Sequence, residues 1–235
     1  MTTGAEANIL TTATIPLLAR CRALLLVAAI SACSASAAPL PDPATDATLA
    51  RTPTTARAVF AGGCFWGVEA VFESLKGVTN AVSGYSGGKL ANPTYQMVGT
   101  GATGHAEAVE VTYDPSKITY GQLLKVFFAV AHDPTQRNRQ GPDVGAQYRS
   151  AIFYLDAPQK ATAEYVMASL TDAKVFARAI VTELTPLPAF YPAEAYHQNY
   201  LVQHLTQPYI VYNDLPKLEA LKAEFPEWHR MPASG

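Results

Sequence analysis

A chain of 235 residues with 49% hydrophobic side chains is long enough to bury one sizeable core, and we expect a single globular domain. Its 17 basic and 19 acidic residues nearly cancel, so the overall charge does not attract phosphate backbones or anionic lipid. We therefore do not expect nucleic acid as a partner.

Residues 1–38 have the pattern of an export signal. Arg20 and Arg22 precede a short apolar run at residues 23–32, and small residues and proline follow it. Such a run is too short to span a bilayer comfortably, which favours a signal over a membrane helix; a buried N-terminal helix is the alternative. The segment before Arg20 is unusually long for a leader, which leaves a start downstream of Met1 open.

Two processing sites compete at the end of this signal. The sequence "ISAC" at residues 30–33 resembles the lipobox of bacterial lipoproteins and would make Cys33 a lipidated N-terminus, whereas "ASA" at residues 35–37 resembles an ordinary signal-peptidase site. The lipobox is slightly favoured. Both outcomes predict export to the periplasm, and the first adds a membrane anchor. Cys64 is then the thiol left in the folded domain, because Cys21 and Cys33 precede it.

The first elements of the domain place Cys64 at the start of a helix. Residues 39–57 are rich in Pro, Thr and Ala without apolar periodicity, which predicts a disordered tether before a domain over residues 58–230. Residues 58–63 predict a short buried strand ending in two glycines. A helix follows, with apolar residues at helical spacing and Gly77 at its C-terminal cap. These apolar residues are Val68, Val71, Phe72 and Leu75.

The middle of the chain predicts a long loop, a strand and a helix. Residues 84–104 are glycine-rich and longer than most connections within a domain. Residues 105–114 alternate as a strand does. Thr119 and Gln122 have the spacing of a capping box, and the apolar stripe after them predicts a helix.

The last third of the domain again mixes strands with helices. After a loop at residues 132–147 we expect a strand at 148–155, a helix at about 158–170, a strand at 179–184, a short helix at 192–201 and a final helix from about Pro216. Because the elements do not alternate strictly, the pattern predicts an α+β fold, a two-layer α/β sandwich with a mixed central sheet.

The position of Cys64 allows two interpretations. A helix N-terminus favours negative charge and would lower the pKa of the thiol from about 8.5 toward neutrality, which makes a nucleophile. Cysteine is also commonly a small packed core residue, and position alone does not decide between the two.

Glu107 favours the reactive interpretation. It has the parity of Val109, Val111 and Tyr113 and should share their buried face, whereas Glu110 points away. Burial raises the pKa of a carboxyl, so Glu107 could act as a general acid near neutral pH. The alternative is an ion pair with a nearby basic residue at the end of the strand.

Several polar and aromatic residues are candidates for the surrounding pocket. Phe65 and Trp66 would form an apolar wall, although one of them, Phe65 first, could be ordinary core. Tyr95 and Tyr148 adjoin glycine-rich loops, and Asp143 is either a site residue or a turn aspartate. The scattered histidines give no metal motif, and "GYSGGK" lacks the spacing of a phosphate-binding loop.

The order of motifs resembles the A class of peptide methionine sulfoxide reductases. The matching motifs are "GGCFWG", "GYSGG", "NPTY", "TGHAEAVEV", "YDP", "HDPTQ", "RQGPDVGAQYRSAI" and "AEAYHQNY". They extend from about Ala58 to Tyr200, which is essentially the whole globular part. The resemblance makes residues 58–230 a catalytic domain that reduces the S epimer of methionine sulfoxide, in oxidised proteins or free, as a repair of oxidative damage.

The resemblance also implies a role for each candidate residue. Cys64 corresponds to the cysteine that attacks the substrate sulfur and becomes a sulfenic acid, and Glu107 to the acid that protonates the sulfoxide oxygen. Phe65 and Trp66 correspond to the aromatic walls around the S-methyl group. The polar residues that hold the oxygen and the site's water correspond to Tyr95, Asp143 and Tyr148.

No cysteine follows Cys64, whereas many members of this family carry resolving cysteines near the C-terminus. The chain therefore resembles the one-cysteine members. Regeneration is expected to need an external thiol, either a thioredoxin-like protein or a small molecule, and no metal or bound cofactor. We expect a monomer. The alternatives are a thiol peroxidase that uses the same cysteine, or a lipid-tethered module that binds methionine-rich segments without turnover.

Overall fold

The computed structural model describes residues 46–230. The expected export signal, the lipobox with Cys33 and the alternative cleavage site at residues 35–37 lie outside this range. Residues 46–55 of the expected tether form no helix or strand, but they contact the domain. Asp46 accepts a hydrogen bond from the backbone N–H of Gly121 at 3.0 Å, and Ala50 donates one to the carbonyl of Pro115 at 2.9 Å.

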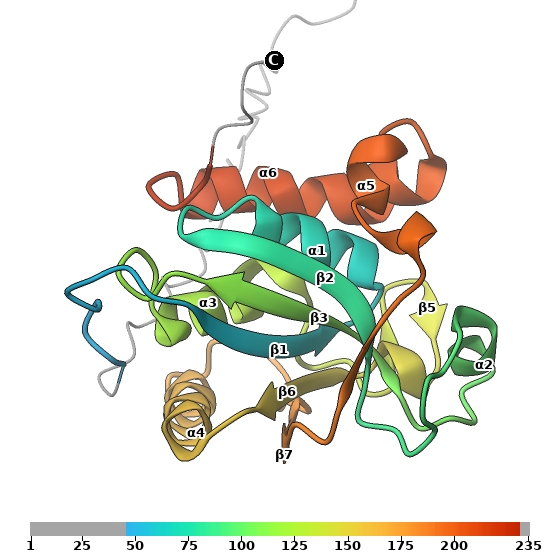
Figure 1. The fold of residues 1–235 in the computed structure, drawn as a ribbon, viewed down its shortest axis with the longest axis horizontal. Coiled ribbons are helices and arrows are strands. Elements are labelled where there is room, and N and C mark those ends of the chain that lie inside the picture. Colours follow the sequence, from blue (N-terminus) through green and yellow to red (C-terminus); the bar gives the residue numbers. More distant parts are fainter. Residues whose placement is uncertain (1–45, 231–235) are drawn as a thin grey trace, which may run out of the picture. The chain divides into compact units, whose positions relative to one another are not determined.

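Strands and helices alternate irregularly along the chain (Figure 1). The strands are β1 (Ala56–Gly62), β2 (Val78–Ser86), β3 (Ala106–Tyr113), β4 (Arg139–Gln140), β5 (Asp143–Val144), β6 (Ser150–Tyr154), β7 (Glu183–Pro186) and β8 (Phe190–Pro192). The α-helices are α1 (Phe65–Glu73), α2 (Tyr95–Gly99), α3 (Tyr120–Val126), α4 (Ala157–Asp172), α5 (Tyr200–Gln203) and α6 (Leu215–Glu224). Short 3₁₀ turns, η2 (Ala146–Tyr148) and η3 (Ala195–His197), and π-helical turns, η1 (Phe127–Ala131) and η4 (Ile210–Asp214), complete the described chain. No helix within residues 46–230 is long and apolar enough to cross a membrane.

The central sheet has the strand order β7-β6-β1-β3-β2-β8. Strand β7 runs parallel to β6, and the other neighbours are antiparallel. The expected α+β class with a mixed sheet is thus confirmed. Strands β4 and β5 form a separate small hairpin.

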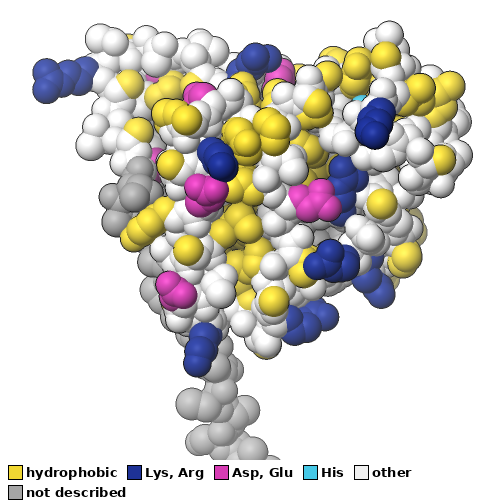
Figure 2. All heavy atoms as spheres, turned by 90° about the horizontal axis from the view of Figure 1, so that it is seen from below, with side chains coloured by type: hydrophobic (Ala, Val, Ile, Leu, Met, Phe, Trp, Pro, Cys, Tyr) yellow, Lys and Arg dark blue, Asp and Glu magenta, His cyan; other side chains and the backbone are white. Residues whose placement is uncertain are grey.

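Most of the core lies between one face of the sheet and the helices. Phe60 of β1 stacks on Phe72 of α1 and on Phe127 of η1, both at 5.0 Å between ring centroids. A smaller cluster on the other face includes Val59 and Phe153 and is covered by loop and edge residues. The alternation of β1 side chains between two apolar clusters explains why both faces of this strand are buried. Seen from below the view of Figure 1, the surface carries interspersed basic and acidic side chains with apolar ones between them (Figure 2).

The expected capping box at the start of α3 is present. The hydroxyl of Thr119 accepts a hydrogen bond from the N–H of Gln122 at 3.1 Å, and the Gln122 side chain accepts one from the N–H of Thr119 at 2.9 Å. Two N–H groups that the first helical turn leaves without partners are satisfied in this way.

The prediction of a loop at residues 84–104 is partly wrong. Its first three residues end strand β2, which the sequence analysis missed, and α2 lies near its middle. Gly84 pairs with Ala108 of β3 and so continues β2. A side chain at this position would overlap the ring of Phe190 on β8, which explains the glycine. This glycine marks the close approach of two strands, whereas the sequence pattern assigned it to a loop.

The C-terminal third differs from the prediction in its boundaries. The strand expected at 179–184 begins only at Glu183, and β8 was not predicted. The helix expected at 192–201 is broken into η3 and α5, because Asn199 between them adopts the left-handed conformation at φ 54°. Helix α1 ends before Gly77, with Ser74 as its C-cap.

Candidate active site

Cys64 lies between β1 and α1, as the N-cap of the helix. Its φ of −54° and ψ of 123° are not helical, so it precedes the first turn, whose N–H groups lack partners within the helix. Gly63 before it has φ +90°, a conformation that glycine adopts without strain. A side chain at Gly63 would also overlap Gln140 of the small hairpin. The expected strand, glycine turn and helix are therefore all present.

The Cys64 thiol is free and only 7% exposed. Burial raises its pKa well above the ordinary value, and the negative charges of Glu107 and Asp214 raise it further, while the N–H of Trp66 acts in the opposite direction. The expectation that the helix start lowers the pKa toward neutrality is wrong, because desolvation outweighs the helix N-terminus. The resting cysteine is a protonated thiol.

Glu107 lies near the start of β3 and is 3% exposed, on the face that its parity predicted. Its Oε2 accepts a hydrogen bond from the backbone N–H of Phe65 at 3.0 Å. Burial raises its pKa to about 8, although this hydrogen bond acts in the opposite direction. The alternative of an ion pair is not realised, since no salt bridge among residues 46–230 involves Glu107. Glu110 points to the other face and pairs with Arg57 at 3.0 Å.

Phe65 and Trp66 differ in their surroundings. Phe65 is fully buried and lies 5.9 Å from the ring of Tyr85, so it belongs to the core as well as to the site. Trp66 is half-buried and stacks on Tyr200 with 3.8 Å between ring centroids. Its indole N–H donates to Nδ1 of His197 at 3.1 Å, which fixes the orientation of the ring.

The remaining predicted residues converge on the same place. The ring of Tyr95 lies 6.5 Å from that of Phe65. Burial and the negative charge of Glu107 raise the pKa of the Tyr95 hydroxyl to about 12, and the same two causes raise the pKa of Tyr148. Asp143, on β5, accepts a hydrogen bond from the hydroxyl of Tyr209. The structure thus brings Tyr95, Tyr148 and Asp143 to the region around Cys64 and Glu107.

The segment after β8 supplies site residues that the sequence analysis did not single out. Glu194 accepts hydrogen bonds from the hydroxyl of Tyr85 and from the backbone N–H of Tyr95, each at 2.9 Å. Partial burial would raise its pKa, but these bonds lower it below its usual range, so it is a carboxylate. His197 and Tyr200 hold Trp66. The motif "AEAYHQNY" contained this signal, because it combines an acid, a histidine and aromatics within one short segment.

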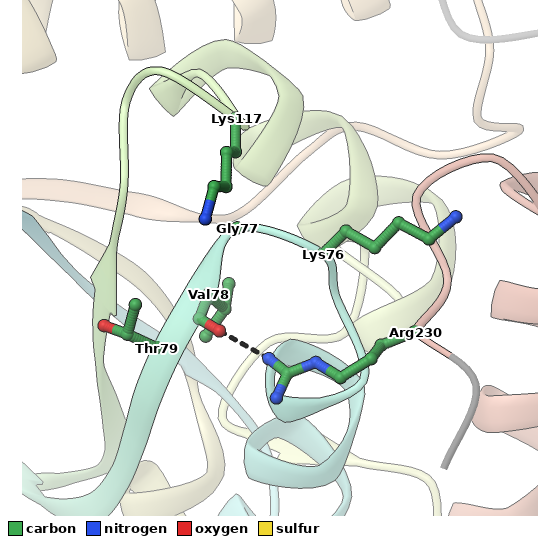
Figure 3. A pocket seen from close by; sticks show the side chains of 6 residues that line it. All are labelled: Lys76, Gly77, Val78, Thr79, Lys117 and Arg230. Carbon is green, nitrogen blue, oxygen red and sulfur yellow. Dashed lines mark hydrogen bonds between the residues drawn. The ribbon is translucent and has the colours of Figure 1, made fainter. Parts of the chain in front are cut away.

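A pocket at the other end of α1 is not part of this site. It is lined by Lys76, Lys117 and Arg230 (Figure 3). Arg230 donates to the carbonyls of Leu75 and Val78, and Lys76 donates to the carbonyl of Glu227. Lys76 and Arg230 thus hold the segment around residues 227–230 against the end of α1 and the start of β2, whereas Lys117 pairs with Asp114 at 3.7 Å. Among residues 46–230, no group of three or more His, Cys, Asp and Glu side chains could hold a metal ion.

The geometry places two neutral acids close together in a buried region that is rich in aromatic side chains. A thiol and a protonated carboxyl both lie at the first turn of α1, and aromatic rings surround them. This arrangement suits a cysteine nucleophile whose reaction needs a proton on the leaving or developing oxygen.

Residues 56–229 match the family described as peptide methionine sulfoxide reductase. The chain belongs to this family. It is 58% identical over 174 residues to the peptide methionine sulfoxide reductase MsrA 2 of Mesorhizobium japonicum, a match that covers 74% of this chain and 89% of the relative.

Two solved structures have a similar fold. The methionine sulfoxide reductase A of Corynebacterium diphtheriae is 37% identical, with a TM-score of 0.59, and the match covers 72% of this chain and 85% of that one. Mxr1 of Saccharomyces cerevisiae in its reduced form is 30% identical, with a TM-score of 0.61, over 68% of this chain and 94% of that one. The family expected from the motifs is confirmed.

Replacing Glu107 with Gln should make the stability of this reductase less dependent on pH. The folded-state pKa of about 8 lies above the ordinary 4.5, so the folded chain binds this proton more tightly than the unfolded chain. The contribution of this proton to the free energy of unfolding is complete below the ordinary pKa. It is lost as pH rises toward 8, by up to about 1.4 kcal/mol per pH unit. Urea unfolding at several pH values in this window should show Glu107→Gln gaining stability relative to the native chain as pH rises. Glu110→Gln on the opposite face is the matched control, and a constant difference for Glu107→Gln would contradict the assignment.

Proposed function

We propose that this protein reduces the S epimer of methionine sulfoxide, bound in proteins or free, to methionine at the expense of thiols. The observation that carries the proposal is the hydrogen bond between the N–H of Phe65 and the carboxyl of Glu107, which sets a protonated acid beside the N-cap cysteine. Membership of the family supports the same reaction.

In the first step the sulfur of Cys64 attacks the sulfoxide sulfur, and the sulfoxide oxygen needs a proton because it leaves poorly as an anion. Glu107 supplies that proton, since its pKa of about 8 keeps it protonated at neutral pH. The oxygen leaves as water, with this proton and the thiol proton of Cys64, as the S–S bond forms. Water then adds to the Cys64 sulfur and breaks the S–S bond, which returns a proton to Glu107 and leaves a sulfenic acid and free methionine. The cysteine sulfur loses two electrons and the sulfoxide sulfur gains them.

The pocket walls explain the choice of substrate. Phe65 and Trp66 present aromatic surfaces that suit an S-methyl group, because methyl and sulfur contacts with rings are favourable. The hydroxyls of Tyr95 and Tyr148 and the carboxylate of Asp143 bind the oxygen and ordered water. A sulfoxide sulfur is chiral, so a wall for the methyl group and donors for the oxygen accept one epimer only.

Regeneration uses an external thiol, because no cysteine follows Cys64. The first thiol condenses with the sulfenic acid and releases water, and a second thiol reduces the mixed disulfide, which restores Cys64. A thioredoxin-like protein or a small thiol supplies both equivalents. The proposed cycle uses no resident metal or cofactor and is carried out by a monomer.

The purified protein with dithiothreitol should reduce the S epimer of a methionine sulfoxide peptide and leave the R epimer unchanged. The aromatic wall and the oxygen donors have a fixed placement that accepts one configuration at the sulfur. Chiral chromatography of the residual substrate measures how much of each epimer remains. Cys64→Ser should lose all turnover, while Glu107→Gln should still bind substrate and lose at least about 100-fold in rate. Equal activity on both epimers, or turnover with hydrogen peroxide but not with sulfoxide, would contradict the proposal.

Mass spectrometry after one turnover without reductant should find one added oxygen atom on the peptide that contains Cys64. The sulfenic acid persists because the domain has no second thiol to attack it. Dimedone labelling of the same peptide is the confirming measurement, and Cys64→Ser is the control. A Cys33–Cys64 disulfide in the mature protein would contradict both this mechanism and lipidation of Cys33.

We also propose that the protein works in the periplasm, anchored by lipid on Cys33. Support comes from the apolar run and the sequence "ISAC" at residues 30–33. Labelling of the mature N-terminus should find an acylated Cys33, and Cys33→Ala should move the protein from the membrane fraction to the soluble periplasm. An unmodified N-terminus just after residue 37 would show instead that the signal is removed by ordinary cleavage.

A further inference from the structure

A buried ion pair lies against the first turn of α1. Helix α6 runs beside α1 (Figure 1) and carries Lys217, and Asp214 ends the π-helical turn η4 that leads into it. Asp214 is 0% exposed, and its Oδ1 lies 3.1 Å from Nζ of Lys217, whose side chain is 17% exposed. Neither residue belongs to the set that the sequence predicted for the site.

Gly67 brings this pair close to the cysteine. A Cβ on Gly67 would overlap the carboxylate of Asp214 and would lie 2.8 Å from Nζ of Lys217, so both charged groups pack on the bare backbone of α1. Gly67 lies in the first turn of α1, which Cys64 caps, so both charged groups pack on the turn that follows the cysteine. Their charges act on the thiol, since Asp214 raises its pKa and Lys217 lowers it.

The pair is an unusual feature for a core. Taking two charges out of water is costly, and a single contact between them seldom repays that cost. Oδ2 of Asp214 is also buried and has no hydrogen-bond partner among the described residues. Stability alone therefore does not account for the pair.

The other polar groups around Cys64 are acidic or neutral. They are Glu107 on β3, Asp143 on β5, and the hydroxyls of Tyr95, Tyr148 and Tyr209. His132, beneath the glycine turn, donates from Nδ1 to the carbonyl of Phe127 at 3.0 Å and bonds through Nε2 to the hydroxyl of Ser150 at 2.6 Å. Burial lowers its pKa, so it is neutral. Among the side chains of residues 46–230 that change the pKa of Cys64, Lys217 is the one that lowers it.

We propose that Lys217, held against Gly67 by Asp214, is a positioning residue that supplies the positive charge compensating the thiolate of Cys64. Asp214 has two opposed effects: it fixes the ammonium group in place, and its own negative charge disfavours the thiolate. The pair thus sets how readily the buried thiol ionises. This inference rests on the proposed function only in taking Cys64 as the nucleophile.

The test measures thiol ionisation without any sulfoxide. The full-length protein is alkylated with iodoacetamide from pH 6 to 11, and mass spectrometry follows the peptide that contains Cys64, since the thiolate is the reacting form. Lys217→Met should move the midpoint of the rate profile up by about one pH unit, which is about a tenfold slower reaction below the midpoint. Lys217→Arg should restore the native midpoint, and Lys222→Met, an exposed lysine on the same helix, is the matched control.

The variant Asp214→Asn distinguishes an electrostatic role of the Asp214–Lys217 pair from a purely structural one. It keeps an oxygen that can accept from Lys217 but removes the negative charge, so the midpoint should move down, opposite to Lys217→Met. If the pair were purely structural, the midpoints of both variants would shift in the same direction. That result, or an unchanged midpoint in Lys217→Met, would overturn the proposal. If Lys217→Met does not fold, the direction of the midpoint shift in Asp214→Asn and the midpoint of Lys217→Arg still test the proposal. Because no sulfoxide is used, these outcomes do not depend on whether the proposed reductase activity is found.

Discussion

The hydrogen bond from the backbone N–H of Phe65 to Glu107 joins the start of α1 to β3, and the arrangement of the site depends on it. Strands β1 and β3 are neighbours, with Phe60 opposite Val109, so Glu107 lies on β3 beside the end of β1 where the chain turns into the helix. On its other side Glu107 is opposite Tyr85 of β2. A shift of one residue in this register would turn the carboxyl to the opposite face of the sheet.

The C-terminal segment completes the pocket because side-chain amides and carboxyls attach it to β2 and α1. Gln198 accepts from the N–H of Ser83 at 2.9 Å and donates to the Ser83 carbonyl at 3.0 Å, as a neighbouring strand would. Glu69 on α1 accepts from the Ser83 hydroxyl at 2.8 Å and from the N–H of Asn199 at 3.0 Å. These bonds hold Glu194 and His197, and through them the aromatic wall, at a fixed distance from the cysteine.

The parts of the site that follow from local patterns could be predicted from the sequence. The parity of Glu107, the strand–glycine–helix around Cys64 and the capping box of Thr119 each depend on a few neighbouring residues. The parts that depend on contacts distant in sequence could not be predicted. Gly84 lies in β2 because it pairs with β3, and it is a glycine because Phe190 packs on it. Asn199 takes the left-handed conformation that breaks the expected helix and donates its N–H to Glu69. The pKa of Cys64 was misjudged for the same reason, since burial by the whole domain outweighs the local effect of one helix end.

The raised pKa values of Cys64 and Glu107 have one cause and act together. In a pocket of low dielectric, each neutral form is favoured by desolvation, and a charge on one group disfavours a charge on the other. A protonated Glu107 therefore removes one of the obstacles to a thiolate on Cys64, while keeping the proton that the proposed reaction delivers to the sulfoxide oxygen. If Glu107 ionised first, it would have no proton to give and would hold the thiol protonated. Because burial raises the pKa of Glu107 to about 8 and that of Cys64 well above its ordinary value, Glu107 is the group that ionises first as pH rises, and both groups are neutral only below about pH 8.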